Sequence, residues 1–240
     1  MKIALLGFGK MGAEIEKIAV ERGHTICGKI TSENTHKISA VLKSADAAIE
    51  FSRPDTAVSN ILKCFDAQVP AIVGTTGWYD HFEQVIRELK KSNATMLYAT
   101  NFSIGVNITF KLNQLLAKIM NSQPAYTPSI HEIHHIHKVD APSGTACTLA
   151  EGVINTLDSK TRYQLNSNGQ GDELRVTAER TNEVPGTHIV TYESEIDKIE
   201  LKHQAKSRAG FAMGAVLAAE FCNDRYGLFT MDDLLQINSI

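Results

Sequence analysis

The sequence predicts a protein of the α/β class with two domains, and three observations carry this prediction. Short apolar runs alternate with helical patterns over residues 1–103, a glycine-rich turn follows the first run, and the alternation stops near residue 104. Strands that alternate with helices in this way form a parallel sheet that helices cover on both faces. The N-terminal domain is therefore expected to hold a Rossmann-type parallel sheet, and the second domain an α+β arrangement.

The N-terminal elements begin with a βαβ unit. An apolar run at residues 2–6 is expected to form a strand, and residues 13–20 a helix on which Ile15, Ile18 and Ala19 share a face. Gly23 ends this helix. Further strands are expected at residues 24–30, 47–51 and 71–73 and near Tyr98, with a helix at residues 55–67 and another before the last strand.

The second domain has a different order of helices and strands. A long helix is expected from residue 104 to about residue 121, then a strand at residues 129–136 and a helix that opens at Ser143. Residues 187–193 and 197–203 alternate between apolar and polar side chains, which predicts an antiparallel pair with one polar face. A last helix is expected at residues 210–221, and residues 166–172 have the composition of a mobile loop.

The composition argues against several classes of protein. With 43% hydrophobic and 21% charged residues and a formal net charge of −3, the 240-residue chain lacks the basic excess of a nucleic-acid-binding protein. No apolar run reaches the length of a membrane span, and no secretory signal pattern opens the sequence. The cysteines form no Cys-x-x-Cys pair, so we expect a cytoplasmic protein with four free thiols: Cys27, Cys64, Cys147 and Cys222.

The glycine motif at residues 7–12 follows a strand and opens a helix, which is the context of a dinucleotide-binding turn. Glycines allow the backbone to approach a pyrophosphate, and the helix N-terminus faces its negative charge. We therefore expect Gly7, Gly9 and Gly12 to bind a dinucleotide cofactor, with a merely tight turn as the alternative. Three polar strand ends are expected on the same rim of the sheet, at residues 51–54, 74–77 and 100–103.

The side chains at the end of the second strand are expected to determine the preference for NADH or NADPH. An acidic side chain there accepts hydrogen bonds from the ribose of NADH. Here Lys29, Thr31 and Ser32 occupy that end. A cation and two hydroxyls suit a 2′-phosphate better, which favours NADPH slightly. Glu33 lies close enough to oppose this preference, and a Lys29 that is simply solvated is the alternative.

Residues 132–146 carry three histidines, a lysine and a helix-opening Ser-Gly-Thr turn, and no other segment is so dense in chemical groups. On the expected strand, Glu132, His134 and Ile136 share one face, whereas His135 and His137 share the other. This division does not bring together the several ligands that a zinc site needs, so no metal is expected. His137 is interpreted as a buried structural residue.

The turn at Ser143, Gly144 and Thr145 presents several amides and two hydroxyls beside a glycine that permits close approach, an arrangement suited to a carboxylate. Lys138 would add the matching positive charge. A helix N-cap at Ser143 or Thr145 is the simpler alternative. Arg180 and Arg208 are either further anion ligands or surface groups, and the sequence leaves both possibilities open.

The whole chain, and above all residues 132–146, resembles the 4-hydroxy-tetrahydrodipicolinate reductase family of lysine and diaminopimelate biosynthesis. Residues 73–77 and 101–107 and the Phe-Ala-x-Gly-Ala sequence at 211–215 support the resemblance. It implies the reduction of 4-hydroxy-tetrahydrodipicolinate to tetrahydrodipicolinate by NADH or NADPH, with a hydride passing to a cyclic conjugated imine that carries two carboxylates. It also implies a homotetramer built through the sheets of the second domain.

The resemblance implies roles for individual residues. His134 would be a proton donor or acceptor with a pKa of about 6.5, and Lys138 a second proton donor. Together with the features above, it places the small-molecule dicarboxylate substrate at His135, Ser143, Gly144 and Thr145. It places the cofactor at Gly7, Phe8, Gly9, Lys10, Met11, Gly12, Gly74, Thr75, Thr76, Ala99, Thr100, Asn101 and Phe102, and the charge argument at the end of the second strand adds Lys29.

The family's C-terminal segment returns to the cofactor domain, and residues 226–232 fit such a return. The expected domains are residues 1–103 with 212–240 for dinucleotide binding, and residues 104–211 for substrate binding and tetramerisation.

Two other functions are compatible with parts of the sequence. An amino-acid dehydrogenase of related architecture would keep the glycine turn without needing the sequence at 132–146, and a cofactor-sensing protein would bind without chemistry.

Overall fold

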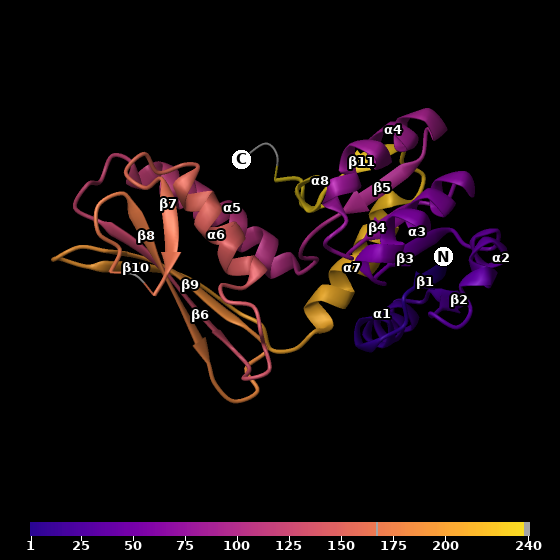
Figure 1. Cartoon of the computed structure of the whole chain (residues 1–240), viewed down its shortest axis with the longest axis horizontal. Coiled ribbons are helices and arrows are strands. Elements are labelled where there is room, and N and C mark those ends of the chain that lie inside the picture. The colour runs from indigo at the N-terminus through magenta and orange to yellow at the C-terminus, as the bar shows by residue number, and fades with distance from the viewer. Residues whose placement is uncertain (167, 238–240) are drawn as a thin grey trace. The chain divides into compact units, whose positions relative to one another are not determined.

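The computed structural model describes residues 1–166 and 168–237, which fold into two units. The first unit holds residues 1–104 and the chain from Arg208 onward, and the second holds Gly105–Ser207. A division after residue 211, as expected from the sequence, would cut helix α7 (Ala209–Cys222), whereas the structural division precedes that helix. Figure 1 shows the elements of each unit.

The first unit is built on a six-stranded sheet in the order β11-β5-β4-β3-β1-β2. All of its pairings are parallel, which confirms the Rossmann-type sheet. Its strands are β1 (Lys2–Leu6), β2 (Thr25–Ile30), β3 (Ala47–Glu50), β4 (Ala71–Val73), β5 (Thr95–Tyr98) and β11 (Gly227–Phe229). β11 pairs with β5 at the edge, so the chain returns to this unit over the expected residues.

The strand ends of the first sheet are in register. Leu6 pairs with Glu50, Glu50 with Val73, and Val73 with Tyr98. The carboxyl ends of β1, β3, β4 and β5 therefore form one rim, as the polar strand ends predicted. Ligands of open parallel sheets bind beyond such a rim.

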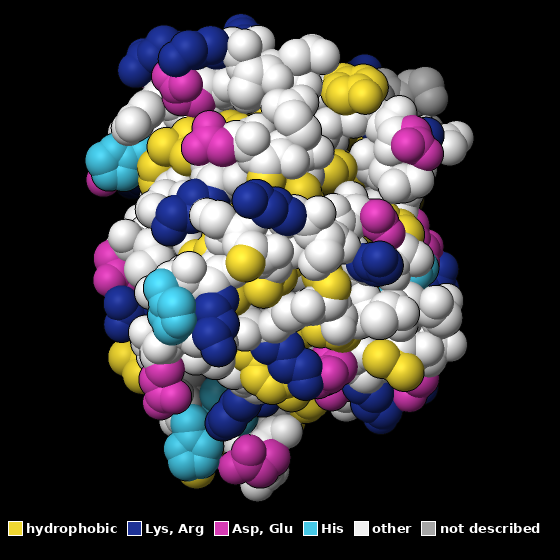
Figure 2. Space-filling model, turned by 90° about the vertical axis from the view of Figure 1, so that its right-hand side faces the viewer, with side chains coloured by type: hydrophobic (Ala, Val, Ile, Leu, Met, Phe, Trp, Pro, Cys, Tyr) yellow, Lys and Arg dark blue, Asp and Glu magenta, His cyan; other side chains and the backbone are white. Residues whose placement is uncertain are grey.

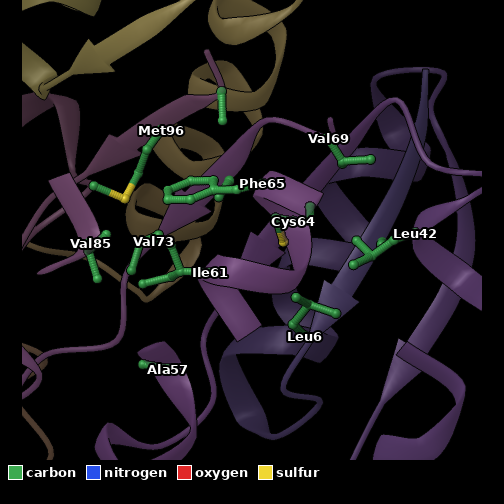
Figure 3. Close-up of a cluster of buried hydrophobic side chains, with 14 of the residues drawn as sticks. Leu6, Leu42, Ala57, Ile61, Cys64, Phe65, Val69, Val73, Val85 and Met96 are labelled. Carbon is green, nitrogen blue, oxygen red and sulfur yellow. The ribbon is translucent and has the colours of Figure 1, made fainter. Parts of the chain in front are cut away.

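Alternation along each strand produces two hydrophobic layers. Leu6 lies in the layer under α2 (Ile38–Leu42), α3 (Pro54–Asp66) and α4 (Phe82–Ser92), which Figure 3 shows. Leu5, its neighbour, lies in the opposite layer with α1 (Lys10–Glu21) and α7. Because successive strand side chains point to opposite faces, helices can cover both sides of the sheet. The unit is completed by α8 (Met231–Leu235) and by the short 3₁₀ helices Thr35–Lys37 and Tyr79–His81.

The second unit holds a five-stranded mixed sheet in the order β10-β9-β6-β8-β7. Its strands are β6 (Thr127–His134), β7 (Arg162–Leu165), β8 (Glu173–Arg180), β9 (Thr187–Glu193) and β10 (Lys198–Gln204). β9 and β10 pair antiparallel as predicted. Strands β7 and β8 were not anticipated; the predicted loop at residues 166–172 lies between them, with Ser167 outside the described residues.

Helices α5 (Ile104–Met120) and α6 (Gly144–Ile154) share one hydrophobic core with this second sheet. Ala117 of α5 and Leu149 of α6 pack in a cluster with Ile130, Val176 and Val190 from three neighbouring strands. Ser143 caps α6, and its amide donates to the Glu132 carboxylate of β6, so α6 begins beside this strand. The dense segment at residues 132–146 therefore runs from the end of a core strand to the start of a core helix.

The described residues contain no helix both long and apolar enough to cross a membrane. The face drawn in Figure 2 carries Lys and Arg side chains interspersed with Asp and Glu. This mixture agrees with the small net charge of the chain.

Gly214→Ala is expected to lower the free energy of unfolding by about 1–3 kcal/mol, the usual cost of overpacking. Gly214 lies in α7, where an added Cβ would overlap the backbone carbonyl of Phe102. Gly210→Ala in the same helix is the matched control, because its Cβ would meet only the Ser103 hydroxyl at 3.6 Å. Urea denaturation measures both variants, and equal unfolding midpoints would contradict the expected clash.

Candidate active site

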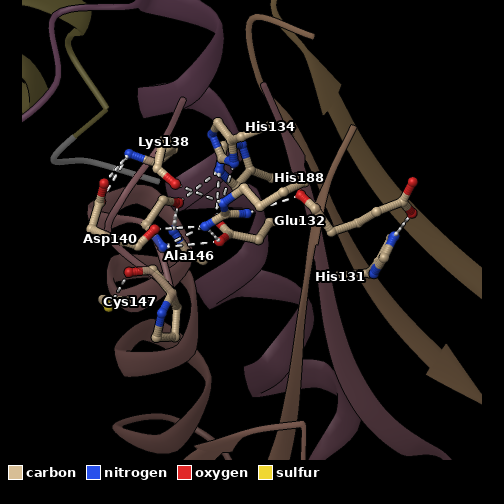
Figure 4. Close-up of polar contacts among 12 residues, drawn as sticks. His131, Glu132, His134, Lys138, Asp140, Ala146, Cys147 and His188 are labelled. Carbon is tan, nitrogen blue, oxygen red and sulfur yellow. Dashed lines mark hydrogen bonds and ion pairs between the residues drawn. The ribbon is translucent and has the colours of Figure 1, made fainter. Parts of the chain in front are cut away.

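The Glu132 carboxylate lies at the centre of the polar cluster in the second unit and is 0% exposed. Burial alternates along β6, so Glu132 and His134 point into the protein on the same side. The Ser143 amide donates to both carboxylate oxygens at 3.1 Å, and Arg180 Nη2 donates to Oε1 at 2.9 Å (Figure 4). Burial raises the pKa of Glu132, but these hydrogen bonds outweigh it, so the net pKa lies below the usual value.

Ser143 is the N-cap of α6, as the simpler interpretation of the turn predicted. Its Oγ accepts a hydrogen bond from the Ala146 amide at 3.2 Å and lies 3.1 Å from His188 Nε2. The buried Ser143 side chain is thus engaged within the protein. The amide of Gly144 occupies the first helical position, where an α-helix offers no internal acceptor.

Arg180 is part of this cluster rather than a plain surface group. Besides Glu132, its guanidinium donates to the backbone carbonyls of Asp140 at 2.6 Å and Lys138 at 3.3 Å. It therefore attaches the loop after β6 to the buried carboxylate. Arg208, the other arginine left open by the sequence, precedes α7 in the first unit.

Lys138 is held by Asp140. Its ammonium donates to both carboxylate oxygens, at 2.7 and 2.8 Å. Burial raises the pKa of Asp140, but the hydrogen bond and charge of Lys138 bring it below the usual value. The Lys138 side chain is 22% exposed and that of Asp140 59%, so the pair is reached from solvent. An incoming anion would compete with Asp140 for the ammonium.

His134 and His188 are buried together, with ring centroids 5.0 Å apart. Burial lowers the pKa of His134 more than Glu132, 3.4 Å from its Nδ1, raises it, and Lys138 and Arg180 lower it further. The expected pKa of about 6.5 is therefore wrong for the protein without ligand. Burial and the His134 charge lower the pKa of His188 to about 3, so His188 is neutral at neutral pH.

The strand ends at His134, earlier than predicted, and this changes the positions of the residues that follow. His135 begins a turn in which its carbonyl accepts from the Lys138 amide at 3.1 Å. Ile136 is 60% exposed and so does not share the buried face of Glu132. His137 is also exposed, 3.5 Å from Glu183, so its interpretation as a buried structural residue is wrong. The pairing of β6 with β8 ends here, and its last pair is His134 with Arg180.

Glu132, His134 and His188 bring three potential metal-ligand atoms within 4.8 Å of one another. The sequence did not anticipate this grouping, because His188 comes from β9. The Glu132 carboxylate is already bound by the Ser143 amide and Arg180. The positive charges of Arg180 and Lys138 also oppose a bound cation. The cluster is therefore better suited to an anion and to proton transfer.

In the first unit, the glycine turn opens α1 as a dinucleotide-binding turn requires. Gly9 is the N-cap without a side-chain cap, and a Cβ there would meet no atom within 4 Å. Gly7 has φ +98° and packs so closely on residues 51 and 52 that a Cβ would overlap Phe51 and lie 2.8 Å from the Ser52 Cα. The backbone thus leaves the first amides of α1 open to a phosphate. These residues fit a dinucleotide.

The other expected cofactor residues follow β4 and β5, on the rim shared with the glycine turn. A Cβ on Gly74 would overlap the Phe51 ring, and Thr75 Oγ1 accepts from the Ser52 amide at 2.8 Å. After β5, the Ala99 amide donates to Val73, and Phe102 is buried. Of the expected cofactor residues, only Gly12, Thr75 and Phe102 are buried, and the others are exposed or partly exposed.

Lys29 forms an ion pair with Glu16 at 2.6 Å, and its ammonium lies 4.5 Å from the centre of the Phe8 ring. It is therefore neither simply solvated nor an unpaired cation. Glu16 belongs to α1, whereas the predicted cofactor preference rested on residues 29–33.

The sequence pointed to no role for Glu132 or His188, and it left Arg180 open as an anion ligand or a surface group. Glu132 and His134 are two residues apart on a strand, and this spacing indicates a shared face with His134. Arg180 and His188 meet Glu132 only through the pairing of β6 with β8 and β9. Those long-range contacts leave no local signal in the sequence.

The glycine turn on a parallel sheet and the buried histidine, lysine and carboxylate cluster define a dinucleotide-dependent oxidoreductase. Residues 1–102 match the family model of the dihydrodipicolinate reductase N-terminus, and residues 105–235 match that of its C-terminus. The chain belongs to the 4-hydroxy-tetrahydrodipicolinate reductase family, which confirms the resemblance. Its cofactor is a nicotinamide dinucleotide, NADH or NADPH.

Similar proteins match over most or nearly all of their length. The 4-hydroxy-tetrahydrodipicolinate reductase of Christiangramia forsetii is 47% identical over 236 residues, 98% of each chain. That of Laribacter hongkongensis is 38% identical over 208 residues, 84% of this chain and 77% of the relative. The structure of a dipicolinate-bound dihydrodipicolinate reductase from Paenisporosarcina sp. TG-14 matches with a TM-score of 0.80 at 19% identity, covering 96% and 97% of the two chains.

The rival amino-acid dehydrogenase shares the fold only. An engineered D-amino acid dehydrogenase matches with a TM-score of 0.50 and 12% identity over the full length of both chains. Its likeness extends to architecture, whereas the family match covers the residues of the polar cluster.

Stability is expected to fall as the pH drops below about 6.5, the pKa of histidine in an unfolded chain. Between that value and about 3, where folded His188 titrates, the unfolded state holds one more proton. The free energy of unfolding should therefore decrease by up to about 1.4 kcal/mol per pH unit, and His134 adds to it in the same direction. Urea unfolding between about pH 7 and pH 5 measures the slope.

His188→Gln should flatten this slope, because glutamine can still bond the Ser143 hydroxyl but does not titrate. His137→Gln, at the exposed position, is the control and should keep the wild-type slope. An unchanged slope in His188→Gln would show that His188 titrates normally in the folded protein.

Proposed function

We propose that this protein reduces 4-hydroxy-tetrahydrodipicolinate to tetrahydrodipicolinate with NADPH or NADH, in lysine and diaminopimelate biosynthesis. One observation carries the proposal: Lys138 and the start of α6 lie near the buried His134, whose Nδ1 is 3.4 Å from the Glu132 carboxylate. A lysine and helix amides suit a carboxylate, and a histidine suits proton transfer. A cytoplasmic location belongs to the proposal, and the four cysteines are free.

The names of similar proteins support this substrate. The relatives from two organisms are named for this reaction, and the structural neighbour is described as bound to dipicolinate. Dipicolinate carries two carboxylates on a planar ring, as the proposed substrate carries two on a cyclic imine. A site built from one lysine and several amides is compatible with either.

In the proposed reaction, this chain positions the substrate and supplies a proton. Lys138 exchanges Asp140 for a substrate carboxylate, to which the amides of Gly144 and Thr145 also donate. The conjugated imine would form when the 4-hydroxyl group leaves as water. The cofactor, when bound, would supply a hydride to this imine, and the protein would supply the proton that completes the reduction. Fixing the ring in one orientation accounts for a large part of the rate advantage in such a step.

His134 is proposed to carry the proton, with Lys138 as a second donor and His135 as a substrate ligand. Burial keeps His134 neutral without ligand. A dicarboxylate beside it would raise its pKa, because an anion favours the protonated imidazole. Substrate binding would therefore load the proton that the reaction consumes.

For the cofactor, we propose a slight preference for NADPH. Thr31 and Ser32 follow β2 where an acidic residue would favour NADH. Lys29 adds a positive charge, which its ion pair with Glu16 offsets in part. We therefore expect both cofactors to be used.

We also propose a homotetramer assembled through the sheets of the second unit. The helices that share a core with this sheet, α5 and α6, both lie in a single cluster on one face. On β6, Ser129, His131 and Ile133 point to the other face and are partly exposed. Light scattering would test the mass against four copies of the 26.3 kDa chain.

The deciding experiment follows absorbance at 340 nm with purified protein, either cofactor, and substrate made enzymatically from pyruvate and aspartate semialdehyde. Substrate-dependent oxidation of NADPH or NADH supports the reductase and ranks the cofactors. Tight cofactor binding without turnover would instead support the cofactor-sensing function.

His134→Gln is expected to lower kcat by about a hundred- to ten-thousand-fold, the range for loss of general acid catalysis, with little change in substrate affinity. Lys138→Ala should damage both kcat and KM, because it removes a proton donor and a carboxylate ligand. His137→Gln, close by but exposed, is the control and should keep wild-type kinetics. Wild-type turnover in His134→Gln or Lys138→Ala would remove the role assigned to that residue.

Lys29→Ala is expected to raise the KM for NADPH several-fold more than the KM for NADH, because only NADPH carries the 2′-phosphate. Lys43→Ala removes an exposed charge from the same unit and serves as the control. Steady-state kinetics with both cofactors measures the ratio. An equal change for the two cofactors would separate Lys29 from the choice between them.

A further inference from the structure

Glu50 is a second fully buried carboxyl, and the proposed reaction does not use it. It is the last residue of β3, between β1 and β4 in the sheet, and it is 0% exposed. Its Oε2 is buried and has no hydrogen-bond partner among the described residues. Burial raises the pKa of Glu50 against the hydrogen bonds that lower it. A carboxyl in this position costs stability that an apolar residue would not.

The other oxygen of Glu50 holds Ser52. Oε1 accepts from the Ser52 hydroxyl, from the Ser52 amide at 3.2 Å and from Asn60 Nδ2 at 3.2 Å. The Ser52 amide also donates to Thr75 Oγ1 at 2.8 Å. The carboxyl thus connects Ser52 to α3, and the Ser52 amide in turn contacts the turn after β4.

Residues 51 and 52 contact both the glycine turn and the turn at Gly74. Gly7 packs on the backbone of both residues, and Gly74 packs on the Phe51 ring so closely that neither could carry a Cβ without overlap. The Phe51 amide donates to Leu6 at 2.8 Å, and the Gly74 amide to the Glu50 carbonyl at 2.9 Å. A shift of residues 51 and 52 would therefore move the glycine turn and the Gly74 turn together.

We propose that Glu50 is a positioning residue of the dinucleotide site, which fixes residues 51 and 52 and through them both cofactor-binding turns. This inference rests on the proposed cofactor role of those turns. Glu50 itself would not touch the cofactor. Its contribution would appear in cofactor affinity, because precise placement of backbone amides determines how well they bind a phosphate.

The test compares Glu50→Ala with Glu50→Gln. The alanine variant loses the acceptor for Ser52 and Asn60, so the Kd for NADPH, measured by fluorescence without substrate, should rise on the order of tenfold. The KM for NADPH should rise in parallel, with the KM for the dicarboxylate substrate unchanged. Glutamine keeps an acceptor oxygen of the same reach, so Glu50→Gln should stay within a few-fold of wild type.

Leu42→Ala is the control for stability. Leu42 is buried in the same core on α2, and its loss should lower the melting temperature without changing the Kd for NADPH. If Glu50→Ala does not fold, Ser52→Ala replaces it, because it removes the hydroxyl that donates to Glu50 and that also contacts Thr56 and Asn60. That variant should also weaken NADPH binding.

Two results would overturn the proposal while leaving the reductase function in place. Glu50→Ala, or Ser52→Ala in its stead, could bind NADPH as wild type does, or Glu50→Gln could lose as much affinity as Glu50→Ala. A wild-type protein that binds neither NADPH nor NADH would overturn the cofactor role of the turns, and the role of Glu50 with it.

Discussion

The buried carboxylate of Glu132 is the constraint on which the second unit's polar cluster depends. A carboxylate without water costs several kcal/mol unless cations and amides replace its hydration. Here the replacements come from the Ser143 amide at the start of α6 and from Arg180 at the end of β8. The same contacts fix the start of α6 and attach the loop that carries Lys138. Satisfying one buried charge therefore places most of the groups proposed for catalysis.

The two units use buried carboxyls at strand ends in opposite ways. Glu132 meets a guanidinium, and its pKa falls, so it stays ionised and can balance charge near the histidines. Glu50 is bonded by hydroxyl, amide and backbone groups in the described structure, and burial raises its pKa. The first arrangement suits a site that handles protons and anions. The second suits a fixed support, because its hydrogen bonds join Ser52, just after β3, to Asn60 of α3.

Periodicity and turn residues were sufficient to predict most of the fold. The strand at residues 2–6, the helix start at Ser143 and the antiparallel pair β9–β10 all follow from local patterns. Strands β7 and β8 were missed, and β6 was extended past His134. The end of β6 depends on its partner, because β8 stops at Arg180 opposite His134. The bond from Arg180 to Glu132 spans 48 residues, so no local pattern in the sequence could indicate it.

The charge balance of the cluster shows how a neutral His134 fits the proton-donating role proposed for it. Lys138 and Arg180 contribute two positive charges, and Asp140 and Glu132 contribute two negative charges. Burial then decides the state of His134, and it favours the neutral ring. A dicarboxylate adds negative charge to a site that was balanced without it. In the proposed reaction, protonation of His134 would offset part of this added charge, so substrate binding and proton uptake would be coupled.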